Sequence, residues 1–180
     1  MSVKRNSSQT LMNLNANIET DLEKIERFGK IKEDENFEFR IFLKQQDPRR
    51  VDKIVHKLNR EISEKIDCTS CGNCCTKLKP NVTDQDIEKL SACLKISPEK
   101  IRNDYTVSEG SEQMFKNLPC SFLKRKKCTV YDDRPDDCRS YPHLHKADFT
   151  SRLFQVIANY SVCPIVFNVF ERLKHELRFK

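Results

Sequence analysis

The sequence predicts a mainly α-helical protein: a small helical domain held together by metal, with a short β-hairpin, preceded by N-terminal helices. Apolar residues recur at spacings of three and four along most of the chain, which is the period of an amphipathic helix. The 180 residues include only 3 Gly and no Trp, and so few Gly argue against a turn-rich sandwich or barrel. Nine cysteines, several of them clustered, indicate a metal site.

Three helices are expected before the first cysteine. Residues 9–30 carry one apolar face, formed by Leu11, Leu14, Ile18, Leu22, Ile25 and Phe28. Residues 31–46 mix helical and strand-like spacing, and we expect a short helix there. Asp47-Pro48 predicts the start of a third helix, because Asp can cap a helix and Pro suits its first position. The apolar stripe of this helix runs from Val51 to Ile66.

Two more helix starts follow the first group of cysteines. Thr83, with Asp86 three residues later, is typical of a capping box, and Ser97-Pro98 repeats the cap-then-proline signal. Cys93 is expected on the inner face of the first of these helices, together with Ile87, Leu90 and Leu94. A free thiol on a buried face behaves as a small apolar group, so we interpret Cys93 as structural.

A small hairpin is expected over residues 120–131. Its flanks contain Phe, Thr, Val and Tyr, which favour strands, and we interpret the basic run Lys124-Arg125-Lys126-Lys127 between them as a solvated turn. Two prolines between Asp132 and Pro142 predict a loop or a broken helix. The C-terminal part should contain a helix over residues 148–160 and a last helix that begins at Pro164.

We expect residues 1–60 to form an N-terminal helical segment that packs on a cysteine-cluster domain of residues 61–180, both parts of one structural unit. The first residues lack the apolar segment of a secretory signal. The longest charge-free stretch, Leu153 to Phe170, is interrupted by polar residues and Pro164, whereas a membrane span needs about 20 mostly apolar residues. The sequence thus predicts a cytoplasmic protein with no membrane span.

The first cysteine motif is Cys68–Cys75, with the pattern CxxCxxCC. Nine cysteines in a cytosolic chain indicate metal binding in preference to disulfides. Two residues between cysteines let a turn direct both sulfurs at one metal, and Gly72 suits that turn because it tolerates positive φ. The spacing matches three ligands of the bacterial ferredoxin run, and Cys163-Pro164 supplies a remote Cys-Pro at a helix start.

Cys74 and Cys75 are neighbours whose side chains should diverge, so we expect them to face different directions. With a second group further along the chain, the candidate metal ligands are Cys68, Cys71, Cys74, Cys75, Cys120, Cys128, Cys138 and Cys163. Eight thiolates suit two four-thiolate sites, whereas one site would leave four thiols over; the sequence leaves both open. The spacing favours an iron–sulfur cluster, of the 4Fe–4S type, over zinc, which more typically uses two separate CxxC arms.

These motifs resemble the YkgJ-like cysteine-cluster (CxxCxxCC) family, described as zinc- or iron-chelating proteins. The resemblance covers residues 67 to about 165 and rests on four motifs: Cys68–Cys75, Pro119–Leu123, Cys128–Tyr131 and Arg134–Pro142. It implies chelation of metal by the eight cysteines. A flagellin lysine N-methylase is similar to the family in its cysteine motif, but this chain lacks the Gly-rich loop that would hold the adenosine of S-adenosylmethionine.

Three functions follow as hypotheses. The leading one is a metal-binding protein with one or two sites. The second is a metal-dependent enzyme, lysine N-methylase-like or redox, with a pocket lined by Arg139, His143 or His145. The third is a zinc-stabilised module that binds nucleic acid through the basic turn, and it ranks last because no basic face is interleaved with aromatic residues. The apolar face of residues 9–30 leaves room for a protein partner in each case.

Two arginines flank Cys138, and each has two interpretations. Arg134 and Arg139 could neutralise a negatively charged thiolate site. Equally, they could pair with nearby carboxylates, which belong to Asp132, Asp133, Asp136 and Asp137.

Overall fold

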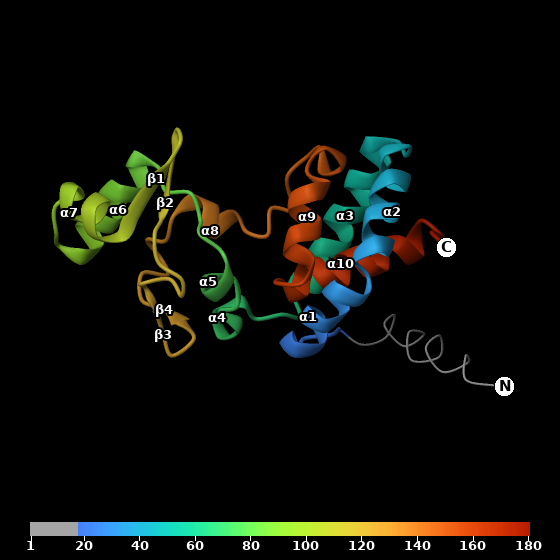
Figure 1. Cartoon of the computed structure of the whole chain (residues 1–180), viewed down its shortest axis with the longest axis horizontal. Coiled ribbons are helices and arrows are strands. Elements are labelled where there is room, and N and C mark those ends of the chain that lie inside the picture. The colour runs from blue at the N-terminus through green and yellow to red at the C-terminus, as the bar shows by residue number, and fades with distance from the viewer. Residues whose placement is uncertain (1–17) are drawn as a thin grey trace. The chain divides into compact units, whose positions relative to one another are not determined.

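Two units make up the part of the chain that the computed structural model describes, residues 18–180 (Figure 1). The helical unit contains the residues up to Ile66 together with Pro142–Lys180, and the cysteine unit contains Asp67–Tyr141. The predicted fold class is confirmed, because the described residues are mainly helical and contain two small antiparallel strand pairs. The expected division into residues 1–60 and 61–180 stays a prediction.

The described part of the helical unit is built from helices that come from both ends of the sequence. They are α1 (Leu22–Ile31), α2 (Glu33–Lys44), α3 (Pro48–Ser63), the 3-10 turn η2 (Phe149–Ser151), α9 (Leu153–Tyr160) and α10 (Pro164–Glu176). Helix α10 packs against α3, α9 and α1 and is buried along most of its length. It is therefore the central helix of this unit.

The local signals that predicted α3 act as expected. Asp47 caps α3 by accepting a hydrogen bond from the backbone N–H of Arg49 (3.0 Å), and Pro48 occupies the first turn. The buried residues of α3 recur at helical spacing: Val51, Val55, Leu58 and Ile62. Residues 31–46, whose pattern was mixed, contain the 12-residue helix α2.

The helix predicted over residues 9–30 is described by the structure only in part. Residues 9–17 lie outside the part that the structure describes, and residues 18–21 are not helical. Helix α1 begins at Leu22, because Asp21 accepts hydrogen bonds from the N–H groups of Glu23 and Lys24. Just before it, the backbone of Glu19 exchanges two hydrogen bonds with the side-chain amide of Asn168 in α10, at 3.0 and 2.8 Å.

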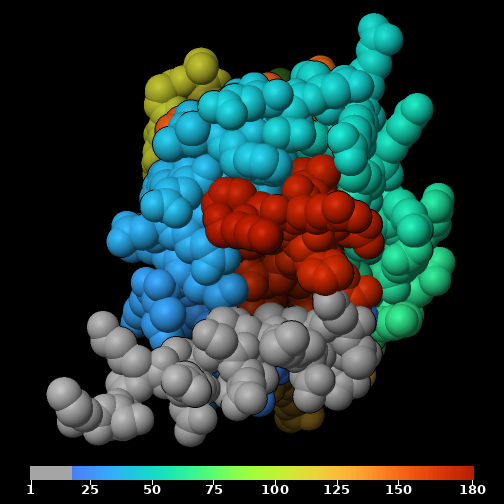
Figure 2. Space-filling view, turned by 90° about the vertical axis from the view of Figure 1, so that its right-hand side faces the viewer, coloured from blue at the N-terminus to red at the C-terminus, as the bar shows by residue number. Residues whose placement is uncertain are grey.

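Aromatic side chains fill the core of the helical unit. Phe39 of α2 lies with its ring centroid 5.1 Å from that of Phe170 and 4.8 Å from that of Phe179. Tyr160 in α9 contacts Phe167 in α10 at 4.9 Å. Figure 2 shows the C-terminal residues lying between α2 and α3 on the face that it presents. The core thus joins the first and last helices that the structure describes.

A charged network lies inside this unit. The Lys174 ammonium, 7% exposed, donates to Glu35 (2.6 Å), Asn36 (2.6 Å) and Glu171 (2.7 Å). Glu171 also accepts from Lys32 and from the hydroxyl of Tyr160, the latter at 2.9 Å. Burial acts to raise the pKa of Glu171, but Lys174 and Lys32 outweigh it and hold that pKa below its usual value.

Helices α9 and α10 contain the charge-free stretch that the sequence analysis compared with a membrane span. Within residues 18–180, no single helix is long and apolar enough to cross a membrane. α9 and α10 reach that length and composition only when they are taken together, and they are bent by 115° relative to each other.

The cysteine unit combines short helices with two hairpins. Its elements are α4 (Cys68–Cys71), α5 (Cys74–Lys77), α6 (Asp84–Leu94), α7 (Pro98–Tyr105), β1 (Thr106–Glu109), β2 (Glu112–Phe115), β3 (Leu123–Lys124), β4 (Lys127–Cys128) and α8 (Asp136–Ser140). The expected hairpin corresponds to β3 and β4, with Leu123 opposite Cys128. The β1–β2 hairpin was not expected from the sequence, and in it Thr106 lies opposite Phe115.

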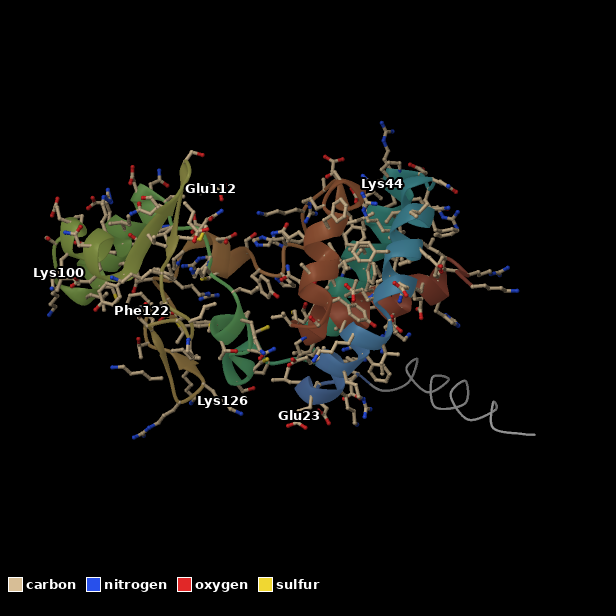
Figure 3. The ribbon with its side chains drawn as sticks, viewed as in Figure 1. Glu23, Lys44, Lys100, Glu112, Phe122 and Lys126 are labelled. Atoms are coloured by element: carbon tan, nitrogen blue, oxygen red, sulfur yellow. The ribbon has the colours of Figure 1, made fainter. Side chains whose placement is uncertain are left out.

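The predicted helix starts of this unit are present, and the unit has an apolar core of its own. Thr83 and Asp86 form the capping box of α6, and Ser97 caps α7. Phe122, which Figure 3 labels, stacks on Tyr105 at 4.9 Å and is surrounded by other buried residues. These are Val82, Ile87, Leu90, Ile101, Phe115 and Val130.

Replacing Lys174 with Met tests the buried network. The change removes the ammonium while Glu171 stays buried, so we expect the free energy of unfolding to fall by about 3 kcal/mol, measured by urea denaturation. Lys30→Met is the matched control, because the Lys30 side chain is 79% exposed and reaches only an exposed Glu26. It should change that free energy by less than about 0.5 kcal/mol. Equal effects of the two variants would show that the network contributes nothing.

Candidate metal centre

The eight predicted ligands are divided between the two units. Seven of them lie in the cysteine unit: Cys68, Cys71, Cys74, Cys75, Cys120, Cys128 and Cys138. Cys163 belongs to the helical unit, where it is buried, 5% exposed, at the residue that precedes α10. All nine cysteines are free thiols.

Four of these thiols come from four separate segments and lie near enough to affect one another's ionisation. We call Cys75, Cys120, Cys128 and Cys138 the four-thiol cluster. Burial raises the pKa of Cys120, and negative charge on Cys75 and Cys128 raises it further. Burial raises the pKa of Cys138 to about 12, with added contributions from Cys75, Cys120, Asp137 and Cys128. Charge on Cys75 thus opposes ionisation of the other three thiols, as expected of like charges at short range.

Backbone hydrogen bonds hold three members of the cluster together. The N–H of Cys120 donates to the carbonyl of Cys75 at 2.8 Å, which ties the β3 segment to α5. The N–H of Leu123 donates to the carbonyl of Cys120 at 2.9 Å, and Leu123 pairs with Cys128 in the β3–β4 hairpin. The side chains of Cys120 and Cys128 also pack against the apolar core that contains Phe122.

Carboxylates anchor the short helix that carries Cys138. Asp86, only 1% exposed, accepts a hydrogen bond from the N–H of Asp136 at 3.1 Å. Asp137 accepts from the N–H of Asn81 at 3.0 Å. Asp86 therefore belongs to the capping box of α6 and also fixes the start of α8. Only the first of these two roles was predictable from the sequence.

The turn after Cys68 has the backbone that its sequence predicted. Asp67 caps α4 by accepting from the N–H of Thr69 at 2.9 Å, and Gly72 follows in the left-handed region with φ 62°. A Cβ atom built on Gly72 would lie 3.0 Å from the backbone oxygen of Lys126, in the turn between β3 and β4. The position therefore requires glycine for two reasons, the backbone angle and the close approach of the hairpin.

The expectation that Cys74 and Cys75 face different directions is wrong. The two side chains hydrogen-bond to each other, and this bond lowers the pKa of Cys75 to about 7. Both residues lie in the first turn of the four-residue helix α5. The helical backbone there leaves adjacent thiols within reach of each other, which an extended chain would not.

The spatial grouping also differs from the grouping along the sequence. Cys75, which ends the CxxCxxCC motif, lies with cysteines that come 45 or more residues later. Cys71 acts on Cys68 instead: burial raises the pKa of Cys68, and charge on Cys71 adds to the rise. A coordination shell is not already in place, since among the described residues no three His, Cys, Asp or Glu side chains are arranged to hold a metal ion.

The two arginines beside Cys138 have different environments. Arg134 lies over the ring of Tyr131, with 3.7 Å between its guanidinium carbon and the ring centroid, and acts to lower the pKa values of Cys68 and Cys128. Arg139 donates to the carbonyl of Asp132 at 2.7 Å and forms an ion pair of 3.9 Å with Asp136. Arg134 therefore fits the interpretation that an arginine neutralises nearby thiolates. Arg139 fits the other interpretation, in which it pairs with carboxylates.

The two histidines expected to line a pocket in the enzyme hypothesis belong to the helical unit. His143 is buried with a positive φ of 62°, and its carbonyl accepts a hydrogen bond from Arg152 at 3.0 Å. His145 is exposed, and desolvation by its surroundings, aided by the charge of Lys146, lowers its pKa.

Cys93 is not the buried residue that the helical pattern predicted. Its side chain is exposed, because the last turn of α6 extends past the core and only Leu94 remains packed against it. A hydrogen bond with Asp133 raises the pKa of Cys93, and the nearby charge of Asp132 adds to the rise.

Two glycine variants test the close approach of the CxxC turn to the hairpin. Gly72 and Gly110 have nearly equal φ values of 62° and 63°, but a Cβ at Gly110 meets nothing within 4 Å. Alanine should cost about 1 kcal/mol of unfolding free energy at either position, because of the left-handed backbone. Gly72→Ala should cost clearly more, because the new methyl group meets Lys126. Equal losses in thermal unfolding would show that this contact is unimportant.

Alkylation of Cys93 tests its hydrogen bond. Asp133→Asn removes the charge that keeps the thiol protonated, so the pKa should fall and more thiolate should be present at pH 8. Reaction of Cys93 with iodoacetamide, followed by mass spectrometry, should then become several times faster. Asp132→Asn, which removes only a weaker electrostatic effect, should produce a smaller increase; the reverse order would contradict the hydrogen bond.

Comparison with known proteins identifies the family. The sequence model of the CxxCxxCC family, described as "Putative zinc- or iron-chelating domain", matches residues 67–164. A relative, the uncharacterized protein MJ0661 of Methanocaldococcus jannaschii, is 36% identical over 84 residues, which cover 42% of this chain and 43% of the relative. The chain thus spans less than half of that relative's length. No solved structure matches the chain.

The matched region begins beside Cys68, ends beside Cys163 and contains all eight predicted ligands. It covers more than half of the chain, and metal binding is the general property that it carries. This protein therefore belongs to the CxxCxxCC family, whose domain is described as zinc- or iron-chelating.

Proposed function

We propose that this chain binds an iron–sulfur cluster, of the 4Fe–4S type, through its clustered cysteines, and that the four-thiol cluster is the principal site. The observation that carries the proposal is the convergence of Cys75, Cys120, Cys128 and Cys138: the N–H of Cys120 donates to the carbonyl of Cys75, and charge on Cys75 raises the pKa values of the other three thiols. Half-buried thiols that repel one another as thiolates become favourable ligands once a cation neutralises them.

The residues fit such a group by their chemistry. Thiolate is the ligand that iron–sulfur clusters and zinc share, and the four thiols are held by the α5–β3 hydrogen bond, the β3–β4 hairpin and α8. Backbone N–H groups of Phe122 and Val130 act on Cys120 and Cys128 respectively, and each lowers the pKa of its thiol. Arg134 adds a positive charge close to Cys128. These groups would favour the thiolate forms that a metal requires.

The remaining candidates form a second set. Cys68, Cys71 and Cys74 have the spacing of three ligands in the bacterial ferredoxin run, and charge on Cys71 raises the pKa of Cys68. Cys163 is proposed as a ligand from its Cys-Pro sequence, and it precedes the 13-residue helix α10, whose N-terminus favours a thiolate. The choice of iron–sulfur over zinc rests on this ferredoxin-like spacing. When bound, such a cluster supplies one-electron redox chemistry.

Anaerobic purification followed by metal and sulfide analysis tests the proposal. The protein should contain iron and acid-labile sulfide and should absorb broadly near roughly 400 nm. Cys138→Ser should lose most of the metal, because it removes one of four ligands from the cluster. Cys93→Ser is the matched control and should keep it, since Cys93 is exposed and hydrogen-bonded to Asp133.

The outcomes separate the parts of the proposal. Zinc without sulfide would contradict the iron–sulfur cluster and leave thiolate metal binding in place. Full metal content in both Cys138→Ser and Cys75→Ser would show that the four-thiol cluster is not a site. Cys163→Ser tests the remote ligand separately, and unchanged metal content would remove it from the set.

A further inference from the structure

Four consecutive cationic side chains occupy the end of the β3–β4 hairpin. We call Lys124, Arg125, Lys126 and Lys127 the cationic tip. Arg125 and Lys126 form the two-residue turn, and Lys124 lies opposite Lys127 in the strand pair. All four residues are exposed, and Figure 3 labels Lys126 at this end of the hairpin. The tip is therefore a small, dense patch of positive charge open to solvent.

Local physical chemistry disfavours this arrangement. Like charges directly opposite each other in a strand pair repel, as Lys124 and Lys127 do here. Arg125 and Lys126 both have positive φ, 51° and 64°, where a two-residue hairpin turn normally uses Asn-Gly because side chains resist that backbone. A sequence chosen for hairpin stability alone would avoid both features.

Nothing in the described part of the chain neutralises the tip. None of its four side chains forms an ion pair or a hydrogen bond among residues 18–180, whereas other lysines of the cysteine unit do. Lys79 pairs with Glu109 at 3.7 Å, and Lys100 pairs with Asp104 at 2.7 Å. The four charges are thus available to a partner.

The backbone of the tip is held in place. The carbonyl of Lys126 lies against Gly72, close enough that a Cβ there would approach it to 3.0 Å. On the other side, Leu123 is tied to Cys120 by a hydrogen bond of 2.9 Å. A rigid backbone lowers the entropy that binding must remove, which suits a preorganised docking site.

We propose that the cationic tip is a docking site for an acidic segment of a protein partner. Opposite charge is what would compensate the repulsion within the tip. The tip is compact, since four cations sit in one turn, and a short run of Asp and Glu can match it. The proposal rests on the hairpin alone and does not depend on which metal the cysteines bind.

The observations favour an acidic protein segment over nucleic acid. The cysteine unit contains 13 basic and 12 acidic side chains, so outside the tip its 9 basic residues are outnumbered by the 12 acidic ones. It therefore lacks the broad positive surface that follows a phosphate backbone. For base stacking, Phe122 is buried, and the ring of the exposed Tyr131 already carries Arg134 at 3.7 Å.

The test measures binding of the full-length protein to a fluorescein-labelled oligoglutamate peptide by anisotropy. The native chain should bind the peptide, and added salt should weaken the binding. The double variant Arg125→Asn with Lys126→Gly should weaken it about tenfold by removing two charges. The same variant should raise the thermal unfolding midpoint, because Asn-Gly suits the turn, so the loss of binding cannot arise from unfolding.

Two controls and two competing probes complete the experiment. Arg125→Lys with Lys126→Arg keeps the charge and should keep the affinity, whereas Lys79→Gln with Lys100→Gln removes two charges elsewhere and should also leave it unchanged. Duplex DNA and phosphatidylserine vesicles are the competing probes. Absence of peptide binding, peptide binding that survives loss of the tip charges, or tighter tip-dependent binding to either competing probe would each overturn the proposal.

Discussion

The close spacing of four thiols, which would repel one another as thiolates, is the constraint around which the cysteine unit is organised. A thiol that ionises beside three others raises the free energy of the whole group, so the unit gains most from its cysteines when a cation lies among them. Every nearby structural feature serves the convergence of these thiols. The α5–β3 hydrogen bond, the glycine that admits the hairpin, and the carboxylates that anchor α8 each bring one segment to the same place. The apolar core of this unit packs directly against two of the four cysteines.

Helix starts were predictable because their signals are local. Asp47-Pro48, Thr83 with Asp86, and Ser97-Pro98 act within a few residues of themselves, so their effect is visible in the sequence. The start of α1 also depends on a local signal, the cap Asp21, whereas the anchoring of Glu19 by Asn168, which lies 149 residues away, was not predictable from the sequence. The exposure of Cys93 was missed for a related reason: periodicity defines a helix face but does not define where the core beneath that face ends.

The candidate site likewise combines features that local sequence predicts with features that depend on distant contacts. The motif spacing identified all eight candidate cysteines and the family, since both depend on residue type and separation. It could not reveal that Cys75 lies with Cys120, because a backbone hydrogen bond between distant segments makes that pairing. The different surroundings of Arg134 and Arg139 are also tertiary, because each depends on the course of the chain between β4 and α8. Residue identity thus predicted that cysteines would be the ligands, whereas the tertiary fold determines which of them lie together.

The helical unit is discontinuous in sequence, and this affects the order in which the protein can form during synthesis. Its central helix, α10, is translated after the whole cysteine unit, yet α3 and α1 pack against it. The early helices therefore lack their main packing partner until the ribosome has made α10, while all eight thiols of the inserted unit have already been synthesised. Domains generally fold as units in the order in which they emerge, so the cysteine-rich insert can acquire its ligand before the surrounding helices close into their final core.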